Sequence, residues 1–120
     1  EMGFEKEPIT RRPKVEQLFE VVEKMPEFPG GNEALFTYLK DNTNYPSRAE
    51  EEGIRGRVYV SFVVEKDSTI TNIQVLRGLG YGCDEEAIRL VKAMPKWKPG
   101  KQRGKAVSVA YNLPISFQLK

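Results

Sequence analysis

A glycine-rich stretch is the first place in this sequence to look for chemistry. In "GLGYGCDEEA", glycines at alternate positions lie between a predicted strand and a predicted helix, where a dinucleotide-binding loop would place its G-x-G-x-x-G pattern. The third glycine of that pattern would fall at Cys83, and three acidic residues follow it where a phosphate needs positive potential. The stretch therefore predicts a flexible loop and an acidic helix start, not a nucleotide site.

Catalytic and metal chemistry lack their usual residues. The chain has no histidine, which removes histidine-dependent triads, His-containing zinc sites and imidazole acid–base catalysis. Cys83 is the sole cysteine, so it has no partner for an internal disulfide, and its place at a helix start predicts packing against Ile88. The carboxylates of residues 50–52 and of Glu65 adjoin turns, and nothing pairs them as an acid and a base. We expect a protein that is not an enzyme and that uses no cofactor or metal.

A basic corner near the C-terminus offers a different chemistry. Five cations surround Trp97, which could in principle stack on a base while the cations contact phosphates. The net charge is only +2, and a tryptophan between two prolines is typical of a core or corner anchor. We expect no nucleic-acid partner, and a solvated turn that guides an acidic partner segment. The five cations are Lys96, Lys98, Lys101, Arg103 and Lys105.

The length and composition fit one globular domain. The chain has 120 residues, of which 39% are hydrophobic and 30% charged. No apolar run reaches the roughly 18 residues of a membrane span. The opening residues 1–30 mix charges with prolines, so we expect an N-terminal arm or linker that could include one extended strand, followed by a single domain over residues 31–120.

Three helical segments are predicted from caps and apolar spacing. A short helix follows "PEFPGG", with Asn32 as its cap, and a helical turn or two starts near Pro46 and stops at Gly53. The clearest helix starts with Asp84 as N-cap and ends before Pro95.

Strands are predicted where the apolar period changes to two. "RVYVSFVVE" and "ITNIQVLR", joined by the turn residues "KDST", predict a β-hairpin. The chain then closes on a long alternating strand that contains Pro114 on its polar-facing side. Because proline cannot donate to a sheet ladder, this strand is predicted to be an edge. The fold class is α+β: an antiparallel sheet of about three strands, or four if the N-terminal segment adds one, with helices on one face and the other face partly wet.

Several motifs in this order resemble the C-terminal domain of the TonB energy transducers. They are "YP" at Tyr45, "GIRGRVYVSFVV" from Gly53, "DEEAIRLVKAMPKWKPGKQRG" from Asp84, and the closing "YNLPISFQL". "MPEFPGG" and the helix after it are similar to an N-terminal extension found in one subgroup of that family. The residues that carry the structural motif are Pro46, Gly56, Pro95, Trp97, Pro99 and Gly100.

The resemblance implies a periplasmic domain of a protein anchored in the inner membrane of a Gram-negative bacterium. Such proteins pass force from a proton-driven inner-membrane complex to TonB-dependent outer-membrane transporters for iron chelates, vitamin B12 or glycans. They bind a short extended segment of the transporter, the TonB box, as a strand added beside the last strand. Here that implies the edge residues Ala106, Val107, Ser108, Val109, Ala110, Tyr111, Asn112, Leu113, Ile115 and Phe117.

Some positions depart from the commoner family pattern. The hairpin turn has Asp67 and Ser68 where Asp-Gly is usual, and Cys83 stands where leucine is frequent. A glutamine-rich segment that touches the box is replaced by the stretch around Asn42 and Asn44, which with Tyr45 forms the secondary contact expected here.

Two alternatives stay open from the sequence. The same domain could belong to a membrane sensor or peptidase that binds a different extended peptide and has no transport role. An unpaired alternating strand can also pair with a second copy, so a homodimer is expected as a further association.

Overall fold

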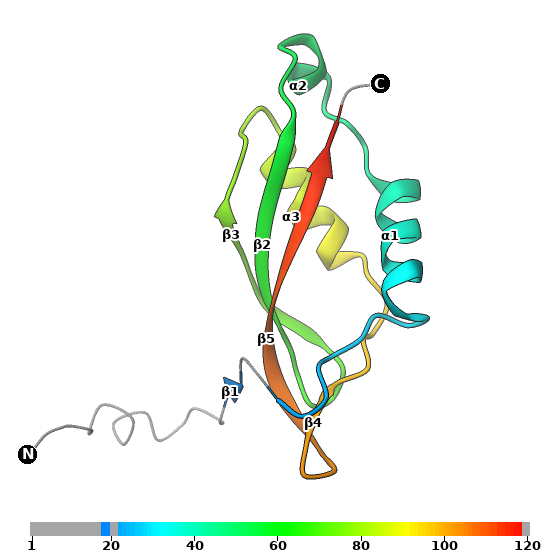
Figure 1. Cartoon of the computed structure of the whole chain (residues 1–120). Coiled ribbons are helices and arrows are strands. Elements are labelled where there is room, and N and C mark those ends of the chain that lie inside the picture. The colour runs from blue at the N-terminus through cyan, green and yellow to red at the C-terminus, as the bar shows by residue number, and fades with distance from the viewer. Residues whose placement is uncertain (1–17, 20–21, 119–120) are drawn as a thin grey trace, which may run out of the picture.

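The structure is a computed structural model that describes residues 18–19 and 22–118 (Figure 1). The predicted order of helix, short helix, strand, strand, helix and strand is confirmed, with two short strands in addition. The elements are β1 (Leu18–Phe19), α1 (Gly31–Asn42), α2 (Ser47–Glu51), β2 (Gly56–Val64), β3 (Ile70–Arg77), α3 (Cys83–Lys92), β4 (Gly100–Gln102) and β5 (Lys105–Phe117).

The sheet has the strand order β1-β5-β2-β3, with β4 paired to β5. β2 lies in the middle, because it pairs antiparallel with β3 on one side and, residue for residue from Gly56 to Val64, with β5 on the other. The predicted α+β fold with an antiparallel sheet is therefore confirmed. β1 differs from this pattern, since Leu18 and Phe19 pair with β5 in parallel.

The basic corner is a β-hairpin that the sequence did not predict. β4 pairs antiparallel with the first residues of β5 across a tight turn at Arg103 and Gly104, whose φ angles are 54° and 77°. A two-residue hairpin turn of type I′ requires positive φ at both central residues, and its twist matches that of the flanking strands. Gly100 allows close approach here, since a Cβ on it would lie 2.7 Å from a methyl group of Val109 and 2.8 Å from the carbonyl of Lys24.

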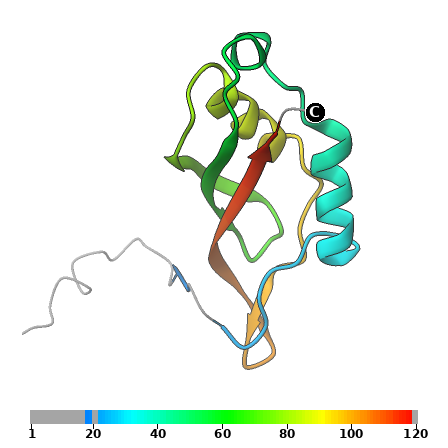
Figure 2. The same ribbon diagram turned by 45° about the horizontal axis from the view of Figure 1, so that its top comes forward.

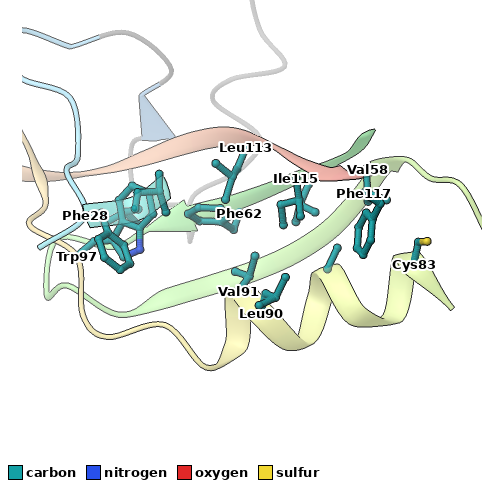
Figure 3. Close-up of a cluster of buried hydrophobic side chains, with 14 of the residues drawn as sticks. Phe28, Val58, Phe62, Cys83, Leu90, Val91, Trp97, Leu113, Ile115 and Phe117 are labelled. Atoms are coloured by element: carbon teal, nitrogen blue, oxygen red, sulfur yellow. The ribbon is translucent and has the colours of Figure 1, made fainter. Parts of the chain in front are cut away.

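The core forms between the sheet and α3 (Figure 3). Alternate residues of β2 and β5, such as Val58 and Ile115, turn to the face that α3 covers. From α3, Leu90 and Val91 point back at that face. They lie three and four residues after the buried Ala87, and residues three and four apart share one side of a helix. The intervening residues Asn112, Pro114 and Ser116 of β5 are exposed, whereas Ser108 is buried, so the other face of the sheet is partly wet as predicted.

The helix starts differ from the predicted caps. α1 begins at Gly31 after Gly30, and not with Asn32 as its cap. α3 begins at Cys83 after Gly82, so Asp84 is not its N-cap either. The Asp84 carboxylate instead accepts hydrogen bonds from the N–H groups of residues 79 and 80, at 2.9 and 3.2 Å. An acidic side chain near a helix start can hold the preceding loop as well as the helix itself.

α1 stands beside the sheet on the side of β5, while β2 and β3 lie on the other side (Figures 1 and 2). Its attachment is aromatic: the Tyr38 ring lies 5.5 Å from the Phe28 ring, and the Tyr38 hydroxyl donates to the carbonyl of Leu90 at 2.7 Å. Phe28, from the segment that precedes the predicted domain start, is buried in the core. None of the helices in the described part of the chain has the length and apolar character needed to cross a membrane.

Candidate partner-binding groove

The outer side of β5 is the main candidate site. From Ala110 to Phe117, β5 pairs with β2, and no other strand in the described residues pairs with this stretch. Backbone N–H and C=O groups on that outer side therefore have no ladder partner, which is the usual template for strand addition.

Pro114 fixes which groups face outward. Pro114 pairs with Tyr59, and the register between β2 and β5 has no irregularity on either side of it. A regular ladder needs N–H donors at alternate residues, and proline has none, so Pro114 must lie at a position that faces away from β2. The N–H groups of Ala110, Asn112 and Ser116 share its direction, and those of the odd-numbered residues between them bond to β2.

A groove of about 850 Å³ adjoins the last part of this edge, from Pro114 onward. α1 and the segment after it form one wall, and the end of β5 forms the other. Figures 1 and 2 show α1 beside β5. The lining residues are Phe36, Leu39, Lys40, Thr43, Tyr45, Glu50, Pro114, Ser116, Phe117 and Gln118.

α1 uses two faces. Leu35, which is 3% exposed, and Tyr38 face the core, while Phe36 lines the groove and is 67% exposed. The groove residues of α1 and the position after it are spaced i, i+3, i+4 and i+7 from Phe36, so they form one stripe along the helix. Apolar spacing alone predicts one stripe in this segment and does not separate the two faces.

The predicted secondary contact lies at the end of this wall. Tyr45 lines the groove, its hydroxyl donates to the carbonyl of Ile54, and its ring meets the Phe117 ring edge-on at 5.9 Å. Asn42 and Asn44 do not line the groove. The Asn42 side chain donates to the Tyr38 carbonyl at 2.7 Å, and the backbone N–H of Asn44 donates to Glu86 at 2.7 Å.

A buried carboxylate fixes the position of this segment. Glu86 is 9% exposed and accepts two hydrogen bonds from Arg89, at 2.7 and 2.6 Å, besides the one from Asn44. Arg89 also donates to the carbonyl of Asn42 at 2.8 Å. Burial by itself raises the pKa of Glu86, but the hydrogen bonds and charge of Arg89 and the Asn44 N–H outweigh it and hold that pKa below its ordinary value. The charged pair ties α3 to the segment that follows α1.

The ten predicted edge residues divide into two groups. Ala106 and Val107 pair with β4, and Ser108 and Val109 pair with β1, so this first part of the edge already has partners within the chain. The others belong to the stretch that pairs only with β2 among the described residues. Within it, Leu113, Ile115 and Phe117 are buried, so their side chains belong to the core and a partner would meet mainly backbone.

The structural-motif residues pack around these strands. Trp97 is 1% exposed, among the rings of Phe28, Phe62 and Tyr111, and so it cannot stack on a base. Its buried indole N–H has no hydrogen-bond acceptor among the described residues. Of the others, Gly56 pairs with Phe117, Pro46 precedes α2, Gly100 is buried, Pro99 is half-buried, and Pro95 is exposed.

The other sequence candidates gain no chemistry from the fold. Cys83 is fully buried, and burial together with nearby Asp84 and Glu85 raises the pKa of its thiol, which disfavours the reactive thiolate. The N–H groups of the glycine loop are partly taken by Asp84. Across the residues that the structure describes, no cluster of three or more cysteine, aspartate or glutamate residues could hold a metal ion.

Comparison with known proteins decides the family. The model of the Gram-negative bacterial TonB protein C-terminal family matches residues 41–119. The chain belongs to this TonB C-terminal family. The match starts within α1 and includes α2, α3 and the strands from β2 to β5.

Two solution structures have the same fold. The Helicobacter pylori TonB C-terminal domain (residues 194–285) is 26% identical, with a TM-score of 0.56, and the similarity covers 73% of this chain and 92% of that one. A longer form (residues 179–285) is also 26% identical, with a TM-score of 0.51 over 72% of this chain and 78% of that one. No curated protein matches the chain. Membership identifies a TonB-like transduction domain of the periplasmic, Gram-negative type.

Proposed function

We propose that this domain binds the TonB box of TonB-dependent outer-membrane transporters by strand addition to β5. The observation that carries the proposal is the stretch Ala110–Phe117, which is regularly paired to β2 on one side and has no described strand on the other. The end of this stretch, at Pro114, Ser116 and Phe117, lines a groove with room for an extended segment. TonB family membership supports an outer-membrane transporter as the partner.

The binding strength expected from such a site is modest. An added strand would make about six backbone hydrogen bonds, each worth roughly 0.5 to 1.5 kcal/mol net, or about 3 to 9 kcal/mol before ordering costs. Free energies of about 4 and 8 kcal/mol correspond to dissociation constants of about 1 mM and 1 μM, so the binding is expected to be weak and reversible. Reversible binding is compatible with a transducer that binds a transporter, transmits force to it from a proton-driven inner-membrane complex, and then dissociates. The cargo would be an iron chelate, vitamin B12 or a glycan.

An NMR titration tests the proposal. The isotope-labelled domain is titrated with a synthetic TonB-box peptide from a transporter of the same organism. We expect saturable shifts that are largest at the outward-facing amides of Ala110, Asn112 and Ser116. Shifts confined to β3 would contradict strand addition at β5. No shifts with a panel of boxes at millimolar peptide would also contradict it, and would favour a peptide-binding domain with a different partner.

A proline substitution tests the role of the outward N–H groups. Asn112→Pro removes one outward donor, and we expect it to weaken peptide binding at least fivefold, whereas Asn112→Ala keeps the N–H and should bind as the unaltered domain does. Ser116→Pro, nearer the end of β5, provides a second test if Asn112→Pro disturbs the sheet. Amide spectra of each variant establish that it is folded. Unchanged affinity in both folded proline variants would place the site elsewhere.

A further inference from the structure

We propose that α1 is the second wall of the partner site, and that Phe36 and Leu39 receive apolar side chains from alternate positions of the added segment. This inference rests on the proposed function, because it assigns side-chain selectivity to a site whose other half is backbone. The occupant is an extended peptide in which at least one apolar side chain points to the side of the sheet where α1 stands.

The exposure of Phe36 is the first observation. Phe36 is 67% exposed, although it lies in the middle of α1 and the preceding residue, Leu35, is only 3% exposed. Leu35, Tyr38 and, in part, Leu39 pack in or against the core, whereas Phe36 does not. A large apolar side chain left at the rim of a groove marks an interaction site more than an isolated exposed residue would.

The position of the groove gives the second observation. A strand added to β5 would lie about 4.8 Å from it, in the space between the β5 edge and α1. Successive side chains of such a strand alternate between the two faces of the sheet. Side chains on one face of the added strand therefore contact the Phe36 and Leu39 side of α1, and the intervening side chains do not. The wall can thus select the residue type at every second position of the peptide.

The wall is held in place before any partner arrives. The Tyr38 hydroxyl bonds to the Leu90 carbonyl, and Arg89 bonds to the Asn42 carbonyl at the end of α1. Both bonds join α1 to α3, which itself packs against β2 and β3. A preformed wall lowers the ordering cost of binding, so an apolar contact with Phe36 can contribute to affinity.

The test compares two exposed apolar residues at opposite edges. Phe36→Ser removes the proposed contact, and Leu76→Ser on β3, where the side chain is 57% exposed, is the matched control. The probe is a TonB-box peptide with apolar residues at alternate positions, together with single-serine variants at each of these. We expect Phe36→Ser to weaken binding about tenfold and Leu76→Ser to leave it unchanged. We also expect one peptide position to lose its sensitivity to serine when Phe36 is already replaced.

The outcomes separate this inference from the proposed function. If the β5 amides respond to the peptide but Phe36→Ser binds as tightly as the unaltered domain, strand addition stands and the wall is wrong. Equal weakening by Phe36→Ser and Leu76→Ser would also overturn the wall, because the effect would then not depend on the groove. If no box peptide moves the β5 amides, the proposed function fails first, and the inference fails with it.

Discussion

Glu86 shows how one residue can position a site that it does not touch. Its carboxylate is buried between Arg89 and the backbone of Asn44, and the segment that it holds leads from α1 to Tyr45. We expect Glu86→Gln to lower the free energy of unfolding by about 1 to 2 kcal/mol, since hydrogen bonds to a charged acceptor are replaced by weaker ones and Arg89 is partly solvated. Urea unfolding at neutral pH measures this loss.

The same pair should make stability depend on pH in the acid range. The folded-state pKa of Glu86 is lower than its ordinary value of 4.5, so the stabilising contribution is present above 4.5 and disappears as the pH falls through the folded-state pKa. The difference between the unaltered domain and Glu86→Gln should therefore shrink on acidification. Glu85→Gln, at an exposed neighbouring position, is the control for removing one charge from this helix start. A gap between Glu86→Gln and the unaltered domain that stays constant down to pH 2 would contradict this assignment.

The sequence could not single out Glu86 among its neighbours. Asp84, Glu85 and Glu86 are adjacent acidic residues at a helix start, and the sequence by itself predicts one acidic cluster there. The fold gives them different environments: Asp84 holds a loop, Glu85 is exposed, and Glu86 is buried against Arg89. The i, i+3 spacing of Glu86 and Arg89 was a signal that could have indicated their pairing.

At the scale of elements, β3 and the part of β5 beyond its pairing with β1 are two edges of the sheet, and they differ. β3 contains Asn72 at a φ of 55°, and its register against β2 shifts between Ser61 and Val63. An irregularity of this kind bends an edge strand and makes it a poor template for a further strand. β5 is regular over the stretch proposed as the binding edge. The sheet is therefore better prepared to accept a partner at β5 than at β3.

The left-handed conformation of Asn72 predicts a specific order of stability. Asn72→Val puts a β-branched residue at positive φ and should lower the free energy of unfolding by about 1 to 2 kcal/mol. Asn72→Gly accepts this φ and should change it by less than about 1 kcal/mol. The midpoint of urea unfolding measures both variants. Equal midpoints for valine and glycine would mean that the irregularity in β3 can relax without cost.

Strand and helix types were largely predictable, and their ends were not. Period-two patterns located β2, β3 and β5, and the apolar spacing before Pro95 located α3, because burial of one face dominates these segments. β4 has only three residues, and its turn uses Arg103 where asparagine or aspartate would have been the usual signal. The helix starts were missed because glycine takes the cap position in both α1 and α3.

At the scale of the whole molecule, the groove combines parts that are distant in sequence. Phe36 on α1 and Pro114 on β5 line the same groove, and neither local sequence predicts that the two residues lie close together. The sequence predicted the backbone half of the candidate site through Pro114 and the family resemblance. The side-chain half depends on how α1 docks through Tyr38 onto α3, which is a tertiary contact.

The arrangement also predicts how the proposed complex resists force. Force along β5 would load the hydrogen bonds of an added strand together, whereas force at one end, directed away from the sheet, would break them one after another. Single-molecule pulling of the domain against a box peptide, attached first through one peptide end and then through the other, compares these geometries. We expect rupture forces that differ severalfold. Equal forces in both geometries would contradict transmission along the strand.

Pro114 has a consequence for folding as well as for the exposed edge. If β5 slipped by one residue against β2, the proline would turn toward β2 and leave a gap in the ladder, while Leu113 and Ile115 would turn from the core to water. A slip by two residues would keep the proline outward but would misalign Phe117 with Gly56 at the end of the pair. Pro114 thus disfavours the one-residue misalignment of β5 against β2, besides facing the unpaired edge.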